Sequence, residues 1–121
     1  MDIRGFKLEV NEMVIKPMLS YMRECIGDGG CGFNIFHVLK CRRLLFVYLK
    51  RLSHIKSPDD AEILGTVKTL VLALNDLNEK TEYALLETEE RENICDVIQR
   101  SAEECGLQEE IDDVTEEWRE W

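Results

Sequence analysis

Residues 34–53, NIFHVLKCRRLLFVYLKRLS, decide the fold that the sequence predicts. No glycine or proline interrupts them, and apolar residues recur at the three- and four-residue spacing of a helix. Further apolar residues fall outside this stripe, so the helix is apolar around most of its girth and should be contacted from several sides. The sequence therefore predicts a central core helix here. Its stripe consists of Ile35, Val38, Leu39, Leu45, Phe46, Leu49 and Leu52, and the residues outside it are Phe36, Cys41, Leu44, Val47 and Tyr48.

Residues 3–26 predict the helix before it. Their apolar positions follow helical spacing, but Pro17 removes one backbone hydrogen bond and crowds the carbonyl four residues earlier. One helix kinked at Pro17 is expected, and a separate helix that starts at Pro17 is the alternative. The glycine-rich segment GDGGCG, residues 27–32, should then form a turn. A phosphate-binding loop is a weak alternative, because no GxxxxGK[ST] pattern and no preceding strand occur.

Two more helices are predicted after the central one. Ser57 is a candidate cap and Pro58 suits a first turn, so a third helix should run to about Asn78. Residues 79–87 form a connection that is expected to turn its two adjacent leucines inward. Thr88 should cap a fourth helix, which Gly106 ends as a glycine cap.

The tail offers one last helical turn, capped by Asp113 or Thr115. With so few breaks in helical periodicity, the chain predicts an all-α fold. It is a compact bundle of about four main helices, the first kinked at Pro17, plus a short C-terminal helical turn. Residues 1–121 should form a single domain, because a chain of this length buries one core.

Charge divides the chain into two unlike halves. Residues 1–56 carry ten Lys or Arg against five Asp or Glu, whereas residues 57–121 carry five against twenty, so the net charge is −10. The basic flank of the central helix, Lys40, Arg43, Lys50 and Arg51, is expected to pack beside the acidic half. An acidic exterior disfavours nucleic acid and anionic membrane as partners and suits a basic protein.

The N-terminus MDIRGFKLEV lacks the pattern of a signal peptide, and charges interrupt every long apolar stretch. The odd number of cysteines without repeated spacing favours reduced thiols. A soluble cytoplasmic protein is expected, in which Cys25 and Cys31, on either side of the glycine-rich turn, would approach each other on oxidation.

Three segments carry a resemblance to a known group. LNDLNEKTEY (residues 74–83), TEERE (88–92) and VTEEWREW (114–121) resemble small, uncharacterised, all-helical bacterial proteins with the same tryptophan-containing tail. The resemblance covers roughly the second half of the chain. It implies an all-helical fold and a bacterial cytoplasm, and it carries over no catalytic residue.

Few residues of the sequence have a spacing that suits metal binding or catalysis. Cys31, His37 and Cys41 are the best metal ligands on offer, but zinc normally takes four ligands at tighter, paired spacings such as CxxC. Cys31 near a helix N-terminus, with His37 or His54 as base, gives the alternative of a small cysteine-dependent enzyme, although no third orienting residue is evident. The sequence therefore predicts no catalytic, cofactor-binding or metal-binding residue.

The function that the sequence favours is a non-enzymatic, acidic protein-protein interaction module. One alternative is an immunity- or antitoxin-type protein that neutralises a basic partner, and another is a homodimer. Tryptophans are frequent interface anchors, so the acidic tail is the candidate interface. It contains Trp118, Trp121, Glu116, Glu117, Asp112 and Asp113.

Overall fold

A computed structural model describes the backbone of residues 1–121 and every side chain except that of Asp28. The described backbone contains helices and no strand, which confirms the predicted all-α bundle. The elements in chain order are α1 (Ile3–Val10), a π-helical stretch (Asn11–Ile15), α2 (Lys16–Cys25), a 3-10 turn (Ile26–Asp28), α3 (Ile35–Ser53), α4 (Asp60–Lys80) and α5 (Thr88–Cys105).

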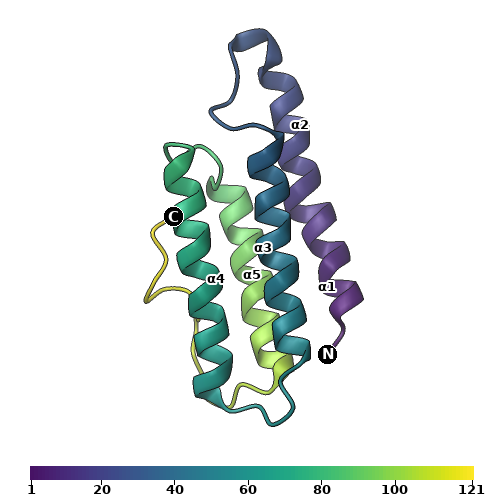
Figure 1. Cartoon of the computed structure of the whole chain (residues 1–121), viewed down its shortest axis with the longest axis vertical. Helices are drawn as coiled ribbons and strands as arrows, with labels where there is room; N and C mark the ends of the chain where they lie inside the picture. Colours follow the sequence, from purple (N-terminus) through teal and green to yellow (C-terminus); the bar gives the residue numbers. More distant parts are fainter.

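The first helix runs through Pro17 as one long rod of α1, the π-helical stretch and α2 (Figure 1). A kink at Pro17 was expected, and the structure has instead a π-helical turn just before it, in which the amide of Lys16 bonds the carbonyl of Asn11. Pro17 has no N–H for the carbonyl of Met13, and the side chain of Asn93 on α5 donates to that oxygen at 3.0 Å. The proline is therefore accommodated by a wider turn and by a hydrogen bond from a neighbouring helix.

Helix α3 is the central element, as predicted. It contacts α1, α2, α4 and α5, and in Figure 1 it lies between the first rod and α4. Its buried side chains differ from the predicted stripe: Ile35 and Leu39 are 39% and 40% exposed. When apolar residues lie on all sides of a helix, their spacing in the sequence does not show which side stays exposed to solvent. The buried residues of α3 are Val38, Cys41, Leu45, Tyr48, Leu49 and Leu52.

Helix α4 begins later than predicted. Its cap is Asp59, whose carboxylate accepts a hydrogen bond from the amide of Glu62 at 2.8 Å, so the prediction of Ser57 as cap is wrong. Two aspartates follow Pro58, and the second of them, Asp60, has another role. Its carboxylate accepts from the amides of Gln108 and Glu109, both at 2.9 Å, and this ties the chain after α5 to the start of α4.

Helix α5 ends as predicted. Gly106 has a φ of +119° and caps the helix in the left-handed conformation, and the amide of Leu107 bonds the carbonyl of Ala102. The helix starts at Thr88, but its N-cap is Glu87, which makes no side-chain capping bond. The tail then lies along α4, and the two chain ends lie on opposite sides of the bundle (Figure 1).

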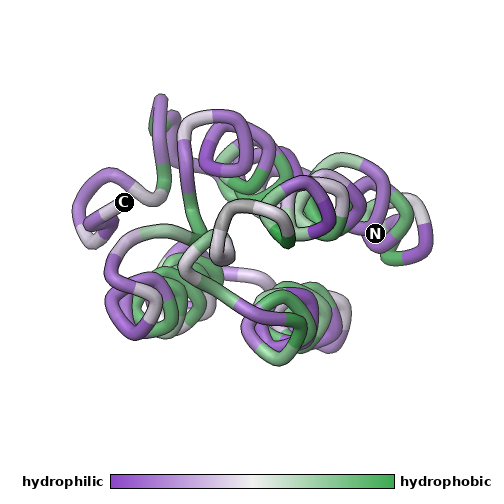
Figure 2. Tube along the Cα trace, turned by 90° about the horizontal axis from the view of Figure 1, so that it is seen from above, coloured by the Kyte–Doolittle hydropathy of each residue, from purple (hydrophilic) through white to green (hydrophobic). Residues whose placement is uncertain are grey.

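The basic flank of α3 does not pair with the acidic half. Lys40, Arg43, Lys50 and Arg51 are all exposed and form no ion pair with any side chain that the structure describes, so that prediction is wrong. The ion pairs seen are mostly one helical turn apart, such as Lys16 with Glu12. Seen from above, hydrophobic and hydrophilic residues share every helix (Figure 2). The packing of α3 against α4 and α5 therefore does not use these cations, which remain on the surface.

Candidate functional site

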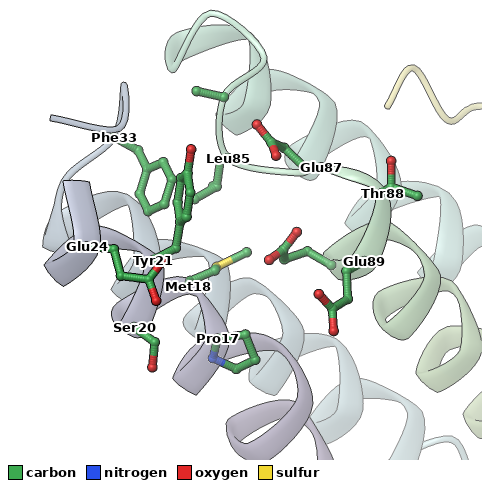
Figure 3. Close-up of a pocket in the computed structure, with 12 residues that line it drawn as sticks. Pro17, Met18, Ser20, Tyr21, Glu24, Phe33, Leu85, Glu87, Thr88 and Glu89 are labelled. Carbon is green, nitrogen blue, oxygen red and sulfur yellow. The ribbon is translucent and has the colours of Figure 1, made fainter. Parts of the chain in front are cut away.

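A pocket of about 390 Å³ opens between α2 and the start of α5 (Figure 3). We call it the acidic pocket, because four glutamates line it. Tyr21 and Phe33 form an aromatic wall, with ring centroids 6.2 Å apart and planes inclined by 25°. In Figure 3, Glu87 and Glu89 lie across the pocket from Tyr21 and Glu24. The four glutamates are Glu24, Glu87, Glu89 and Glu90.

The pocket is held in shape by the connection between α4 and α5. The buried side chain of Asn78 accepts a hydrogen bond from the amide of Leu86 at 3.0 Å, and Thr81 accepts one from the amide of Leu85 at 3.2 Å. Both leucines are buried, as predicted, and Leu85 lines the pocket. Because this connection leads directly into α5, the same bonds fix Glu87 and the glutamates that follow it.

The chain must turn sharply to make this connection. Glu82 and Tyr83 have φ values of +53° and +65°, a left-handed conformation that side chains other than glycine seldom adopt. The amide of Tyr83 bonds the carbonyl of Asn78 at 2.8 Å. The backbone strain is thus offset by hydrogen bonds that converge on one buried asparagine.

The acidic pocket is electrostatically unbalanced. None of its four glutamates forms an ion pair within the part of the chain that the structure describes. Partial burial raises the pKa of Glu90 above its ordinary value, a backbone hydrogen bond opposes that rise, and the charges of Glu89 and Glu87 add to it. A hydrogen bond with Cys25 raises the pKa of Tyr21, and the charge of Glu87 raises it further. A positive group in this pocket would therefore relieve repulsion among charges that already face one another.

Sequence reasoning missed this pocket. It counted the glutamates at the start of α5 as part of the acidic half and did not single out Tyr21, Phe33 or Glu87. The pocket joins α2 to the start of α5, which are far apart in the chain, so no local spacing brings its residues together. The one available signal is the density of glutamate around the start of α5, and that is also typical of an ordinary helix N-terminus.

The predicted interface in the tail lies against α4 and α5. Two side-chain amides hold its backbone. Asn75 donates to the carbonyl of Trp118 at 2.7 Å and accepts from the amide of Glu120 at 3.0 Å. Gln99 likewise donates to the carbonyl of Ile111 at 2.7 Å and accepts from the amide of Val114 at 3.0 Å. The tail is therefore a fixed part of the bundle surface.

The predicted last turn is present and is centred on Asp113. The carboxylate of Asp113 accepts hydrogen bonds from the amide and hydroxyl of Thr115 and from Arg119. Burial alone would raise the pKa of Asp113, but these hydrogen bonds outweigh it and hold the pKa below its ordinary value. The amide of Arg119 closes the turn on the carbonyl of Thr115 at 2.9 Å.

The two tail tryptophans are half-buried against the hydrophobic core. Lys68 lies 5.9 Å from the Trp118 ring and Arg119 lies 5.5 Å from the Trp121 ring. Trp121 Nε1 is buried without a hydrogen-bond partner. Of the four acidic residues in the predicted interface, Asp113 is half-buried, and Asp112, Glu116 and Glu117 are exposed.

The candidate reactive residues are not brought together. Cys31 donates to the carbonyl of Phe33 at 3.4 Å, and among the described side chains no hydrogen bond joins it to His37 or His54. His37 accepts from the amide of Asn34 and so completes the capping box of α3. Cys41 lies in the core, where burial raises the pKa of its thiol to about 12. The five cysteines are present as thiols.

Among the described side chains, no group of three or more His, Cys, Asp or Glu residues is arranged to hold a metal ion. None of the described helices is both long and apolar enough to cross a membrane. No protein-family model, no curated protein and no solved structure matches this chain. The resemblance of the second half to small bacterial proteins thus stays a prediction.

Proposed function

We propose that this chain is a non-enzymatic, cytoplasmic interaction module that binds a basic protein partner through the acidic pocket, in the manner of an immunity-type protein. The observation that carries the proposal is the set of four unpaired glutamates around one pocket with an aromatic wall. Carboxylates and aromatic rings together suit the side chain of a lysine or arginine, through charge-assisted hydrogen bonds and cation–π contact.

The dimensions of the pocket support one or two such side chains. A volume of about 390 Å³ exceeds what a single flexible basic chain requires, and the mouth is open to solvent. Tyr21 is 42% exposed, so its ring is available to an incoming group. The net charge of −10 would also attract a basic partner over longer distances and raise its association rate.

Affinity capture from extracts of the source cell tests the proposal. The bait is the wild type or the triple variant Glu87→Gln, Glu89→Gln, Glu90→Gln, which removes charge and keeps side-chain size. The matched control is Glu109→Gln with Glu110→Gln, at exposed positions after α5. A basic protein should be captured by the wild type and the control and lost with the triple variant.

The captured protein is then titrated against purified bait at rising salt. We expect the triple variant to weaken binding at least about tenfold and salt to weaken the wild-type complex. A third bait, Asp112→Asn with Glu116→Gln and Glu117→Gln, measures how much the tail contributes to binding of the captured protein. Binding that depends on the tail alone, or that is insensitive to salt, would refute the acidic pocket as the site.

A further inference from the structure

A second hollow, of about 430 Å³, lies between α1 and the outer side of α3. We call it the basic groove. Its centre is apolar, with Leu39, Phe46 and Val47, and no carboxylate lines it. The cations around this centre are Lys7, Arg42, Arg43 and Lys50.

The apolar centre is unusually open for a bundle of this size. Leu39 and Val47 are each 40% exposed, and Phe36, one turn before Leu39 on α3, is 76% exposed. Phe46 is half-buried between two cations, with Lys7 at 5.2 Å and Arg42 at 5.9 Å from its ring. Phe36 lies three residues before Leu39, and Phe46 and Val47 lie seven and eight residues after it, so all four fall on one face of α3, with Arg43 between them on the same face. Apolar residues on one helix face can pack against another helix.

The cations of the groove have no ion-pair partner among the described side chains. Lys7, Arg42, Arg43 and Lys50 are absent from the ion pairs that the described residues form, although the chain as a whole is rich in Asp and Glu. The basic groove is thus a positively charged surface with exposed apolar residues on a protein that is acidic as a whole. This combination is complementary to a helix with an apolar stripe and acidic flanks.

We propose that the basic groove docks an acidic amphipathic helix of a partner protein. The occupant lies along α3 between Leu39 and Lys50, a length of about 16 Å or three helical turns. Its apolar residues contact Leu39, Phe46 and Val47, and its glutamates or aspartates pair with Arg43 and Lys50. This surface is separate from the acidic pocket, so it adds a second partner to the proposed function.

A second copy of this chain fits the groove less well. Two copies meeting through the same groove would oppose their unpaired cations, which is repulsive. A copy that offered its acidic half instead would make a head-to-tail contact that does not close. An anionic membrane or a nucleic acid would also have to approach a protein of net charge −10. A short acidic helix meets the same net charge, but it covers the basic groove alone, whereas an extended anionic surface would also face the acidic remainder of the chain.

Fluorescence anisotropy with a synthetic peptide tests the proposal. The probe is a labelled helix of about 18 residues with leucine along one face, glutamate beside the leucines and alanine elsewhere. A second probe, measured separately, has lysine in place of glutamate. The variants are Leu39→Glu and the double charge reversal Arg43→Glu with Lys50→Glu. Their matched controls are Leu72→Glu, at a leucine 47% exposed on α4, and Lys56→Glu with Arg23→Glu.

The glutamate probe should bind the wild type, and both groove variants should weaken it at least about tenfold. Both controls should stay within about twofold of the wild type. Binding of the lysine probe should be the same for the wild type and Leu39→Glu. Circular dichroism should show every variant to be as helical as the wild type, because all substituted side chains are exposed.

Three results would overturn the proposal. The first is no binding of the glutamate probe at about 1 mM, or equal losses in variants and controls. The second is sedimentation of a wild-type dimer that Leu39→Glu dissociates, which would assign the groove to a second copy. The third is cosedimentation with phosphatidylglycerol vesicles that Leu39→Glu abolishes, which would assign it to a membrane surface.

Discussion

The acidic pocket and the basic groove are built in opposite ways. The acidic pocket joins α2 to the start of α5, and a strained connection anchored on Asn78 holds it in place. The basic groove follows one face of α3 and needs only Lys7 from elsewhere. A site made by one helix face depends on that helix alone, whereas a site made by distant segments depends on the loop that brings them together. The two sites should therefore respond differently to the same kinds of change.

The largest expected effect is a reversal of charge in the acidic pocket. Glu87→Lys with Glu89→Lys should weaken binding of the basic partner about a hundredfold, because two attractions become repulsions. The glutamate probe in the basic groove should be affected less than about twofold, since the sites share no residue. Isothermal titration of each ligand measures both. Equal losses for the two ligands would mean that the surfaces are not independent.

Asn78→Ala should disturb the acidic pocket and spare the basic groove. It leaves the buried amide of Leu86 without a partner, and we expect the free energy of unfolding to fall by about 1–3 kcal/mol. Denaturant unfolding measures the loss. Asn75→Ala, on the same helix, is the control: it frees the tail instead of the connection. If Asn78→Ala weakens binding of the glutamate probe as much as binding of the basic partner, the connection between α4 and α5 is not specific to the acidic pocket.

The tail should contribute a pH-dependent part of the stability. The lowered pKa of Asp113 means that its hydrogen bonds stabilise the fold above the unfolded value of about 3.9, and that this stability is lost as the pH falls through the folded value. Asp113→Asn should cost about 1 kcal/mol at neutral pH and less near pH 2. Urea unfolding at the two pH values checks this. If Asp113→Asn lowers the free energy of unfolding equally at both pH values, the effect comes from packing and not from the charge of Asp113.

The smallest effect should come from Glu90. Its raised pKa means that the ionised carboxylate destabilises the fold at neutral pH, and that protonation removes this cost as the pH falls through the raised value. Glu90→Gln should therefore raise the melting temperature by about 1–3 °C at pH 7, and the gain should shrink in acid. The same variant should bind the basic partner more weakly. A lower melting temperature at pH 7 would contradict the repulsion assigned to the acidic pocket.

The sequence predicted the helices well, because helical spacing and glycine caps are local. Asn34 caps the start of α3 and Gly106 caps the end of α5, and each acts within one turn of its helix. The side of α3 that faces the core was harder to predict from the sequence. Tyr48 is buried because its hydroxyl bonds Ser101 at 2.7 Å, a contact with α5 that no pattern within α3 indicates. Leu39 is exposed because nothing packs over it.

The two sites differ in how far the sequence leads to them. Two residues of the basic groove, Arg43 and Lys50, were expected to pack beside the acidic half, and Leu39 and Phe46 were placed in the buried stripe of the central helix. The acidic pocket could not be predicted, because Tyr21 and Glu90 meet only in the folded bundle. The tail residues were recognised as notable, and the hydrogen bonds from Asn75 and Gln99 that fix them required the structure.

Backbone amide chemical shifts test most directly the claim that the molecule carries two separate sites of opposite charge. The glutamate probe and the captured basic partner are titrated separately into the isotopically labelled chain. The glutamate probe should shift the amides of Lys7, Leu39 and Val47, and the basic partner should shift those of Tyr21 and Glu89. Shifts from both ligands on one common set of residues would contradict the two-site description.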